Sequence, residues 1–239
     1  MSLPRLRLEN CTHDGEIWRI NSKEEHHLVR VRRCYNGSLV EGLLAGEKIK
    51  LRLEYINGVL CAHEIVREKE EGYFPKVELL LGLLKNDQLD SALRFSAETG
   101  VYAIHLLICE RSVPRFTAEK AEEKMSRWRK RLDEATKQAG AASAPILYEP
   151  VEFNMFNFDA LPAQRLAALL SPMAKPLAQI KIEKHTSIAI GPEGDWSPDE
   201  SSALMNFNFC PVSLGKRIMR ASTAVCAAAS GLAMLYNDW

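Results

Sequence analysis

Two patterns of apolar and polar residues divide the chain near residue 72. Before this point, short segments alternate between polar and apolar residues and are separated by turn signals. Residues 48–55 alternate strictly, which is the period of a strand with one buried face. Asn57-Gly58 follows and connects this strand to the apolar residues 59–62, as in a β-hairpin. We therefore predict that residues 1–72 form a small all-β unit, folded as a barrel.

Residues 73–239 show a different pattern, in which continuous apolar runs alternate with segments of helical periodicity. Gly100 lies where a helix ends with a residue of positive φ, and Ser197-Pro198-Asp199-Glu200 has the sequence of a capping box. Apolar strands alternating with helices predict an α/β domain with a mostly parallel sheet that is covered on both faces. Residues 145–184 are rich in Pro and predict no regular element. Strands are predicted at residues 77–84, 101–108 and 187–190, and helices at residues 87–99, 117–138 and 223–236.

Composition and charge narrow the class of protein. The chain has 239 residues, of which 46% are hydrophobic and 26% are charged, as in an ordinary globular protein. Its 31 Lys and Arg residues balance its 31 Asp and Glu residues, so the formal net charge is +0. These values exclude a disordered chain, a collagen and a basic tail that coats nucleic acid. They do not exclude an enzyme that meets nucleic acid through a local basic face.

The cysteines and the apolar segments indicate the compartment. The 6 cysteines are widely spaced and include no Cys-x-x-Cys pair, so we expect reduced thiols rather than a disulfide framework. The N-terminus has no apolar secretory core, and no apolar run approaches the ~20 residues that cross a bilayer. We therefore expect a cytoplasmic protein without a membrane segment.

Several familiar kinds of site are missing from the sequence. The sequence of residues 42–48 is similar to that of a phosphate-binding loop but lacks its Gly-Lys-Ser/Thr order. No Gly-x-Gly-x-x-Gly motif follows a strand, which argues against a Rossmann dinucleotide site. The histidines show no metal-binding spacing, and His26 and His27 would point to opposite faces of a strand. We therefore expect no metal.

Two segments have the composition of ligand-binding loops. Residues 190–197, Ile-Gly-Pro-Glu-Gly-Asp-Trp-Ser (the first loop), join a buried strand to the capped helix, and their glycines allow a ligand to approach the backbone. Residues 213–220, Ser-Leu-Gly-Lys-Arg-Ile-Met-Arg (the second loop), place three cations beside apolar residues before the last helix. Each loop alone is equally compatible with a plain surface connection. Because the topology puts both at one edge of the sheet, a shared site is favoured.

The residues of both loops, with others along the chain, resemble those of a known family. In the loops they are Gly191-Pro192-Glu193-Gly194, then Leu214-Gly215-Lys216-Arg217-Ile218-Met219-Arg220 and Thr223-Ala224. Elsewhere they are Pro4-Arg5, residues 26–33, Glu98 with Gly100, Glu110-Arg111-Ser112, Arg127-Trp128, Glu134-Ala135 and Gln138. On these residues the chain resembles the ribosomal small-subunit RNA methyltransferase E family, as a divergent member.

This resemblance implies a fold and an activity. The family methylates N3 of one uridine in the decoding region of 16S rRNA. Its fold is a PUA-like β barrel, here residues 1–72, followed by a SPOUT α/β domain, here residues 73–239, whose trefoil knot binds S-adenosylmethionine. Such enzymes are usually homodimers. The implied protein is thus an S-adenosylmethionine-dependent rRNA (uridine-N3) methyltransferase acting on 16S rRNA or the small subunit.

The resemblance also implies roles for individual residues. Arg220 and Arg5 would contact the uracil and its phosphate. The cofactor would lie against Gly191, Pro192, Glu193, Gly194, Leu214, Gly215, Ile218, Met219 and Ala224. The RNA backbone would meet Arg7, Arg30, Arg32 and Arg33.

Four positions depart from the family's usual residues. Asp195 replaces a Gly, Ser222 a Glu, Phe95 a Lys and Ala141 an Arg. These departures leave two alternatives open. One is a non-catalytic RNA-binding or ribosome-assembly protein on the same fold, in which Asp195 blocks the cofactor pocket. The other is a SPOUT methyltransferase with a different RNA target.

Overall fold

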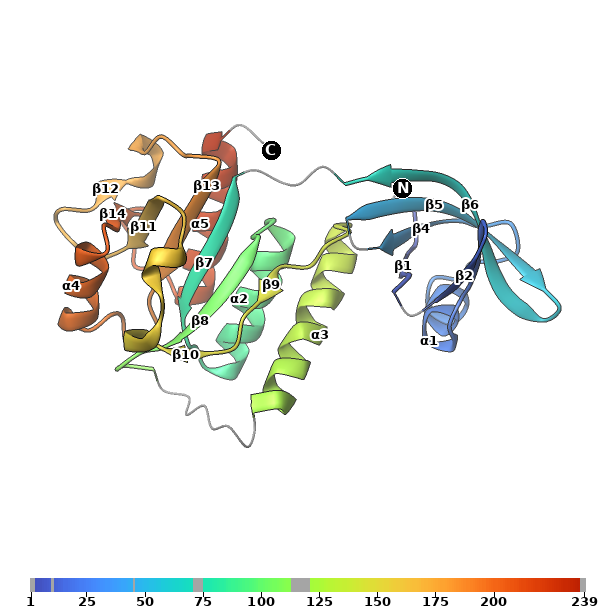
Figure 1. Ribbon diagram of the computed structural model, residues 1–239, viewed down its shortest axis with the longest axis horizontal. Coiled ribbons are helices and arrows are strands. Elements are labelled where there is room, and N and C mark those ends of the chain that lie inside the picture. Colours follow the sequence, from blue (N-terminus) through green and yellow to red (C-terminus); the bar gives the residue numbers. More distant parts are fainter. Residues whose placement is uncertain (1–2, 10, 45, 71–74, 113–120, 237–239) are drawn as a thin grey trace. The chain divides into compact units, whose positions relative to one another are not determined.

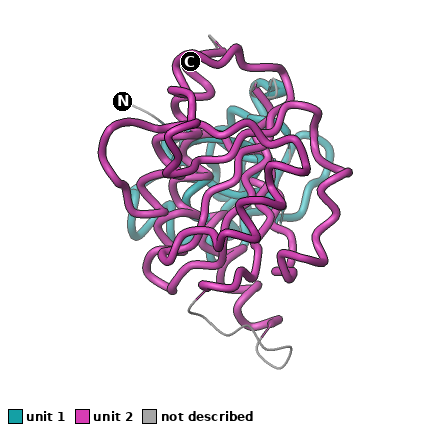
Figure 2. The backbone as a smooth tube through the Cα atoms, turned by 90° about the vertical axis from the view of Figure 1, so that its left-hand side faces the viewer, with its two compact units in different colours: residues 1–72, 134–144 teal, residues 73–133, 145–239 magenta. Residues whose placement is uncertain are grey.

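The chain folds into two compact units, each with its own sheet (Figure 2). The computed structural model describes residues 3–9, 11–44, 46–70, 75–112 and 121–236. The first unit contains residues 1–72 and 134–144, and the second contains residues 73–133 and 145–239. A single boundary at residue 72 therefore omits the segment 134–144, which returns to the first unit.

The first unit is built on a sheet that has, among the described residues, six strands in the order β1-β4-β5-β6-β3-β2 (Figure 1). β1 runs parallel to β4, and the other neighbours are antiparallel. The predicted alternation is confirmed over residues 49–53, because Ile49, Leu51 and Leu53 are at most 1% exposed and the polar residues between them are exposed, but it fails at Tyr55, which is 44% exposed. The strands are β1 (Arg5–Arg7), β2 (Thr12–Asp14), β3 (Ile17–Arg19), β4 (Leu39–Leu44), β5 (Glu47–Ile56) and β6 (Val59–Lys69).

The predicted hairpin joins β5 to β6. Asn57 and Gly58 have φ values of 51° and 79°. Two successive positive values are what a type I′ turn requires, and Asn-Gly is the dipeptide that adopts them most readily. The turn residues thus account for the pairing of Ile56 with Val59.

The first unit is not purely β. Helix α1 (Ser22–His26) and a π-helical turn, η1 (His27–Val31), follow β3. Asn21 starts the helix, since its side-chain oxygen accepts a hydrogen bond from the Glu24 N–H at 2.9 Å. His26 and His27 therefore lie in helical turns that an Asn N-cap begins, and not on opposite faces of a strand.

The returning segment 134–144 is held to the first unit by polar contacts. The Arg5 guanidinium donates to the Gln138 carbonyl at 2.8 Å, and the Arg7 guanidinium donates to the Ala142 carbonyl at 2.9 Å. The Ala142 N–H in turn donates to the Glu70 carboxylate at 2.7 Å. Lys137 forms an ion pair with Glu24, which is 7% exposed. Charged groups from the N-terminal 70 residues therefore depend on this segment for partners.

The second unit contains a parallel sheet, as predicted. Among the described residues, its eight strands follow the order β10-β8-β7-β13-β11-β14-β12, with β9 beside β8 (Figure 1). Each pair of neighbouring strands among the described residues of this sheet is parallel. The strands are β7 (Lys76–Gly82), β8 (Ala103–Ile108), β9 (Ile146–Leu147), β10 (Val151–Glu152), β11 (Gln164–Ala168), β12 (Lys175–Pro176), β13 (His185–Ile190) and β14 (Cys210–Ser213).

The helices cover both faces of this sheet. Leu80, Ala189 and Leu204 belong to one core cluster, which places α4 on that face. The alternate strand residues face the other side, where α2 and α5 pack against each other. The helices are α2 (Asn86–Glu98), α3 (Ala121–Ala139), α4 (Pro198–Asn206) and α5 (Ala221–Tyr236), and 3-10 turns lie at η3 (Phe153–Met155), η4 (Phe158–Ala160) and η5 (Leu177–Gln179).

The predicted helix signals are confirmed where the chain is described. Gly100 has a φ of 74° just after α2. At α4, the Ser197 hydroxyl and the Glu200 carboxylate each accept the other residue's backbone N–H, which completes the capping box. The first four residues of the helix predicted at 117–138 lie outside the described residues.

Candidate functional site

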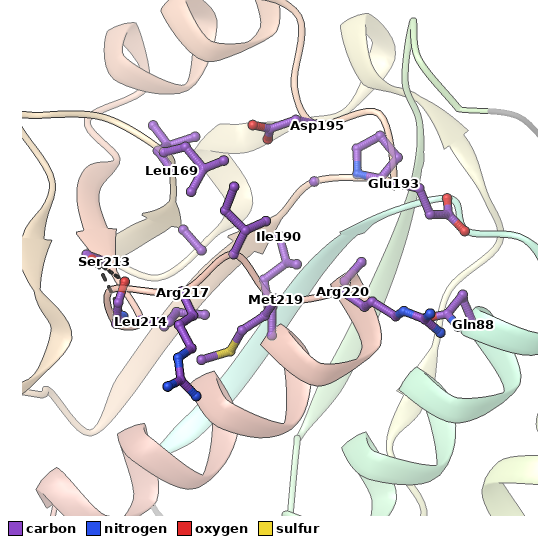
Figure 3. A pocket seen from close by; sticks show the side chains of 18 of the residues that line it. Gln88, Leu169, Ile190, Glu193, Asp195, Ser213, Leu214, Arg217, Met219 and Arg220 are labelled. Atoms are coloured by element: carbon purple, nitrogen blue, oxygen red, sulfur yellow. Dashed lines mark hydrogen bonds between the residues drawn. The ribbon is translucent and has the colours of Figure 1, made fainter.

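A cavity of about 580 Å³ lies at the carboxyl edge of the parallel sheet of the second unit. The wall of the cavity is formed by residues at or after the ends of β7, β11, β13 and β14, and by the first turns of α2 and α5. Open α/β sheets bind ligands at this edge, because loops and helix N-termini converge there with free backbone amides. The two loops singled out in the sequence meet in this wall (Figure 3).

The first loop is held against the sheet by very close packing. Gly82 ends β7, and a Cβ there would lie 2.5 Å from the Pro192 nitrogen. Gly191 is equally confined, since a Cβ on it would lie 3.1 Å from Asp195 Oδ1 and 3.2 Å from the Trp196 backbone nitrogen. Two glycines thus let one backbone segment lie directly on another.

Asp195 shapes the turn of the first loop. Its φ is 61°, a conformation that Gly adopts freely and that Asp tolerates better than most residues. Its carboxylate accepts the Trp196 N–H at 2.8 Å, and its own N–H donates to the Pro192 carbonyl at 2.9 Å. The carboxylate therefore caps the turn, and the cavity stays open around it.

Two side chains fix the first loop to neighbouring segments. The Glu193 carboxylate accepts the Lys85 backbone N–H at 2.9 Å, which caps α2. Arg111 donates to the Gly194 and Trp196 carbonyls, both at 3.3 Å. Because each contact joins the loop to a neighbouring segment, both restrict the position of the cavity wall.

The second loop turns sharply before α5. Gly215 has a φ of 145°, which favours glycine, and Ser213 Oγ bonds with both the Gly215 N–H and its carbonyl. Ile218 is 81% exposed, and Met219 lies partly buried in the wall. Helix α5 then begins, with the Arg220 carbonyl accepting the Ala224 N–H at 2.8 Å.

The structure brings most of the residues expected to hold the cofactor around this cavity. Gly194 is the exception, because it is absent from the lining and a Cβ on it would lie 2.9 Å from Arg111 Cβ. It therefore packs against Arg111 rather than facing the cavity. The expected residues that do line it are Gly191, Pro192, Glu193, Leu214, Gly215, Ile218, Met219 and Ala224.

The two arginines expected at the substrate belong to different units. Arg220 lines the cavity and is exposed, and its side chain extends toward Gln88 (Figure 3). Arg5 lies in the first unit, where it pairs with Glu41 at 2.8 Å and its guanidinium packs over Gly140. Its observed contacts are therefore structural, and a contact with substrate stays a prediction.

The expected RNA-binding arginines differ in exposure. Arg30, Arg32 and Arg33 are exposed together in and after η1, beside Tyr35, which is 75% exposed. The Arg7 side chain is 15% exposed and donates to the Ala142 carbonyl. The first three are thus available to a phosphate backbone, whereas Arg7 is mostly enclosed.

Several residues of the cavity wall were not predicted. Leu169 and Leu170 follow β11, which lies in the stretch that predicted no element. Gln88 lines the cavity and accepts a hydrogen bond from Ser222 at 2.8 Å. The only sequence signal for this pair was the departure at Ser222.

In the part of the chain that the structure describes, no group of three His, Cys, Asp or Glu side chains is arranged to hold a metal ion. No described helix is long and apolar enough to span a membrane.

The fold and the cavity define a class of enzyme. A family model described as RNA methyltransferase domain matches residues 71–233, a stretch that contains the entire cavity wall. The protein is therefore an RNA methyltransferase by family.

Relatives that match most of the chain narrow the class of RNA methyltransferase. A Synechocystis protein named ribosomal RNA small subunit methyltransferase E is 30% identical over 213 residues, which are 86% of this chain and 69% of the relative. A Borreliella burgdorferi protein named ribosomal RNA small subunit methyltransferase E 2 is 28% identical over 246 residues, 97% of this chain and 96% of the relative. The chain belongs to the ribosomal RNA small subunit methyltransferase E family.

A solved structure has the same fold. It is a ribosomal RNA small subunit methyltransferase E from Neisseria gonorrhoeae bound to S-adenosyl methionine, with a TM-score of 0.85 and 24% identity, covering 98% of each chain. At this identity the likeness concerns the fold.

Proposed function

We propose that this chain transfers the methyl group of S-adenosylmethionine to N3 of one uridine in the 16S rRNA of the small ribosomal subunit. The observation that carries the proposal is the meeting of the first and second loops around one cavity at the carboxyl edge of the parallel sheet. Family membership supplies the class of reaction, and the named relatives supply the kind of RNA.

The residues of the cavity fit S-adenosylmethionine. A volume of about 580 Å³ lies within the range of small-molecule sites. Ile190, Leu214, Ile218 and Met219 offer apolar surface for the flat adenine ring, and the glycine-containing loops offer backbone donors and acceptors for its edge. Asp195 offers one negative charge to a cationic ligand. When bound, this cofactor supplies a methyl group on a positively charged sulfur. The sulfur leaves readily as a neutral thioether.

The chain's own contribution is then to align the base and stabilise its charge. Uridine N3 carries a weakly acidic proton between two carbonyls, so the transition state places negative charge on the uracil oxygens. Arg220 lies at the cavity and offers a cation for that charge. Alignment of the base with the methyl group contributes up to roughly 7–11 kcal/mol in favourable systems.

The target uridine has to be unpaired or flipped, because a base pair hides N3. We propose that Arg30, Arg32 and Arg33, with Tyr35 beside them, meet the surrounding RNA. Each exposed arginine that neutralises a phosphate makes the RNA affinity fall more steeply as salt is added. In single strands each such contact adds about 0.7 to the slope of log K against the logarithm of the salt concentration. Arg5 and Arg7 would join this surface through their exposed edges, in addition to their structural contacts.

We further propose that the first unit is a PUA-like barrel and that the second is a knotted SPOUT domain acting as a homodimer. The parallel order β7-β13-β11-β14, with a ligand edge formed by the last two loops, supports this assignment. Size measurement of the purified chain in solution tests the dimer.

The proposal is tested by nucleoside mass spectrometry of small-subunit rRNA from cells with and without this chain. We expect 3-methyluridine to be present only with the chain. A different methylated nucleoside would identify another target. Calorimetry with S-adenosylmethionine separates the non-catalytic alternative, which predicts no binding heat because Asp195 would block the pocket. The cap that Asp195 forms on Trp196, with an open cavity beside it, favours binding.

A further inference from the structure

An uncharged polar side chain of the cavity wall, Gln88, is bonded to a buried serine behind it, Ser222, and the proposed reaction assigns neither a role. Gln88 lies in the first turn of α2 and lines the cavity, and Ser222 lies in the first turn of α5 and is 5% exposed. The Ser222 hydroxyl donates to Gln88 Oε1 at 2.8 Å. The bond joins two helices that pack closely against each other.

This bond decides which end of the Gln88 amide faces a ligand. A glutamine amide has an acceptor oxygen at one end and two N–H donors at the other. Ser222 occupies the oxygen, and the amide nitrogen has no hydrogen-bond partner among the described residues. If the amide were turned around, the Ser222 hydroxyl would accept from the amide nitrogen, but its own hydrogen would lose the one acceptor that it has among the described residues, which is unfavourable. Gln88 therefore presents donors to the cavity.

The neighbouring side chain presents donors as well. Arg220 extends toward Gln88 from the start of α5 (Figure 3), and a guanidinium has no acceptor atom. One part of the wall, formed by Gln88 and Arg220, thus offers donors alone.

Resting on the proposed function, we infer that Gln88, held by Ser222, selects uracil over cytosine by donating a hydrogen bond to a carbonyl oxygen of the target base. Uracil has carbonyl oxygens on both sides of N3, so it accepts from both Gln88 and Arg220. Cytosine has an amino group in place of one carbonyl, so one donor would face another donor. Because a mismatched buried polar pair is strongly disfavoured, this arrangement discriminates between the two bases.

The same contact assists the reaction itself. As N3 loses its proton to solvent, negative charge spreads to the two carbonyl oxygens, and the methyl group then passes from sulfur to N3 with neutral S-adenosylhomocysteine as the leaving group. A donor aimed at either oxygen binds the transition state of this step more tightly than the ground state. Gln88 is in this scheme a specificity residue that touches the base, whereas Ser222 is a positioning residue that acts through Gln88.

Four variants of the full chain test the inference on small ribosomal subunits that lack the modification and carry either uridine or cytidine at the target position. Gln88→Glu keeps the acceptor for Ser222 and removes both donors, while Gln88→Met removes the polar group without adding charge. Ser222→Ala frees the amide to turn. Ser230→Ala is the control, because it makes the same substitution in α5 away from the cavity lining.

The readouts are the rates of 3-methyluridine and 3-methylcytidine formation and the calorimetric Kd for S-adenosylmethionine. Both Gln88 variants should form 3-methyluridine about 10²-fold more slowly, the usual effect of removing one donor to a developing oxyanion, with little change in Kd. Ser222→Ala should lose less rate and should raise the share of 3-methylcytidine, which a purely structural role would not change. Ser230→Ala should match the unchanged chain.

Three outcomes would overturn the inference. Wild-type rates in both Gln88 variants would remove Gln88 from the substrate, and loss of cofactor binding in them would make it a cofactor residue. An unchanged ratio of the two products in Ser222→Ala would refute the positioning role. If the unchanged chain forms no 3-methyluridine, the proposed function itself fails, and this result is distinct from a failure of the variants alone.

Discussion

Replacing Gly82 with Ala tests how the first loop is held in place. A Cβ at this position would lie 2.5 Å from the Pro192 nitrogen and 3.1 Å from the Gly191 carbonyl carbon, whereas ordinary Cβ contacts begin at 3.4 Å. These two neighbours are backbone atoms, and Pro192 Cδ, which lies nearer still, is fixed in the proline ring, so none of them can rotate away. Pro192 has to recede by about 0.9 Å, the difference between 2.5 Å and 3.4 Å, and the cavity wall moves with it.

Overpacking of this kind costs typically 1–3 kcal/mol. We therefore expect Gly82→Ala to lower the free energy of unfolding by about 2 kcal/mol, measured by urea denaturation with an unchanged m-value. Because Gly191 and Pro192 line the cavity, we also expect the calorimetric Kd for S-adenosylmethionine to rise about tenfold, which corresponds to roughly 1.4 kcal/mol.

Gly231→Ala is the matched control. It lies inside α5, where Ala is favoured over Gly by up to about 1 kcal/mol, and its new Cβ would meet only the flexible end of Leu177 at 3.1 Å. This variant should keep the stability and the cofactor affinity of the unchanged chain. If Gly82→Ala behaves in the same way as the control, the close packing does not position the loop and the reasoning is refuted.

Three further predictions concern the capping box, a buried thiol and the loop carboxylate. Ser197→Ala should destabilise the chain by about 1–2 kcal/mol in urea, because Glu200 N–H loses its cap; an unchanged midpoint would contradict this. Burial, with the nearby Glu200 carboxylate, raises the pKa of the Cys109 thiol, so Cys109 stays protonated at pH 8. Iodoacetamide should therefore label Cys109 more slowly than the partly exposed Cys226 in the folded chain. Mass spectrometry of the labelled peptides measures the order of labelling. Asp195→Asn keeps the cap on the Trp196 N–H and removes only the charge. The preference for cationic S-adenosylmethionine over neutral S-adenosylhomocysteine should therefore fall about threefold, as for unit charges ~6 Å apart in water. An unchanged ratio of the two Kd values would place the carboxylate far from the sulfonium.

Local patterns in the sequence predicted the elements whose cause is local. The alternation in residues 49–53, the turn at Asn57-Gly58 and the capping box at Ser197 each depend on neighbours within a few residues, and all three are observed. The two loops were also placed at one edge correctly, because parallel strands bring their carboxyl ends together.

Contacts between distant segments could not be predicted in this way. Ser222 and Gln88 are 134 residues apart, and Arg5 finds its carbonyl partner 133 residues away. Gly194 was expected at the ligand, yet it packs on Arg111, since a motif does not tell which side of a loop faces the cavity. Residues 145–184 fold into strands of two to five residues and single 3-10 turns, which are too short to leave a period.

The returning segment 134–144 has a consequence for anyone who dissects or recombines this gene. A recombinant piece that stops at residue 72 would expose Arg5, Arg7, Glu24 and Glu70 without the groups they bind in the intact chain. The first unit consists of two stretches that join the rest of the polypeptide at three points, so grafting it onto another enzyme requires transplanting both stretches together. Recombination at a single point would transfer residues 1–72 without residues 134–144, so the two stretches of the first unit have to be exchanged together.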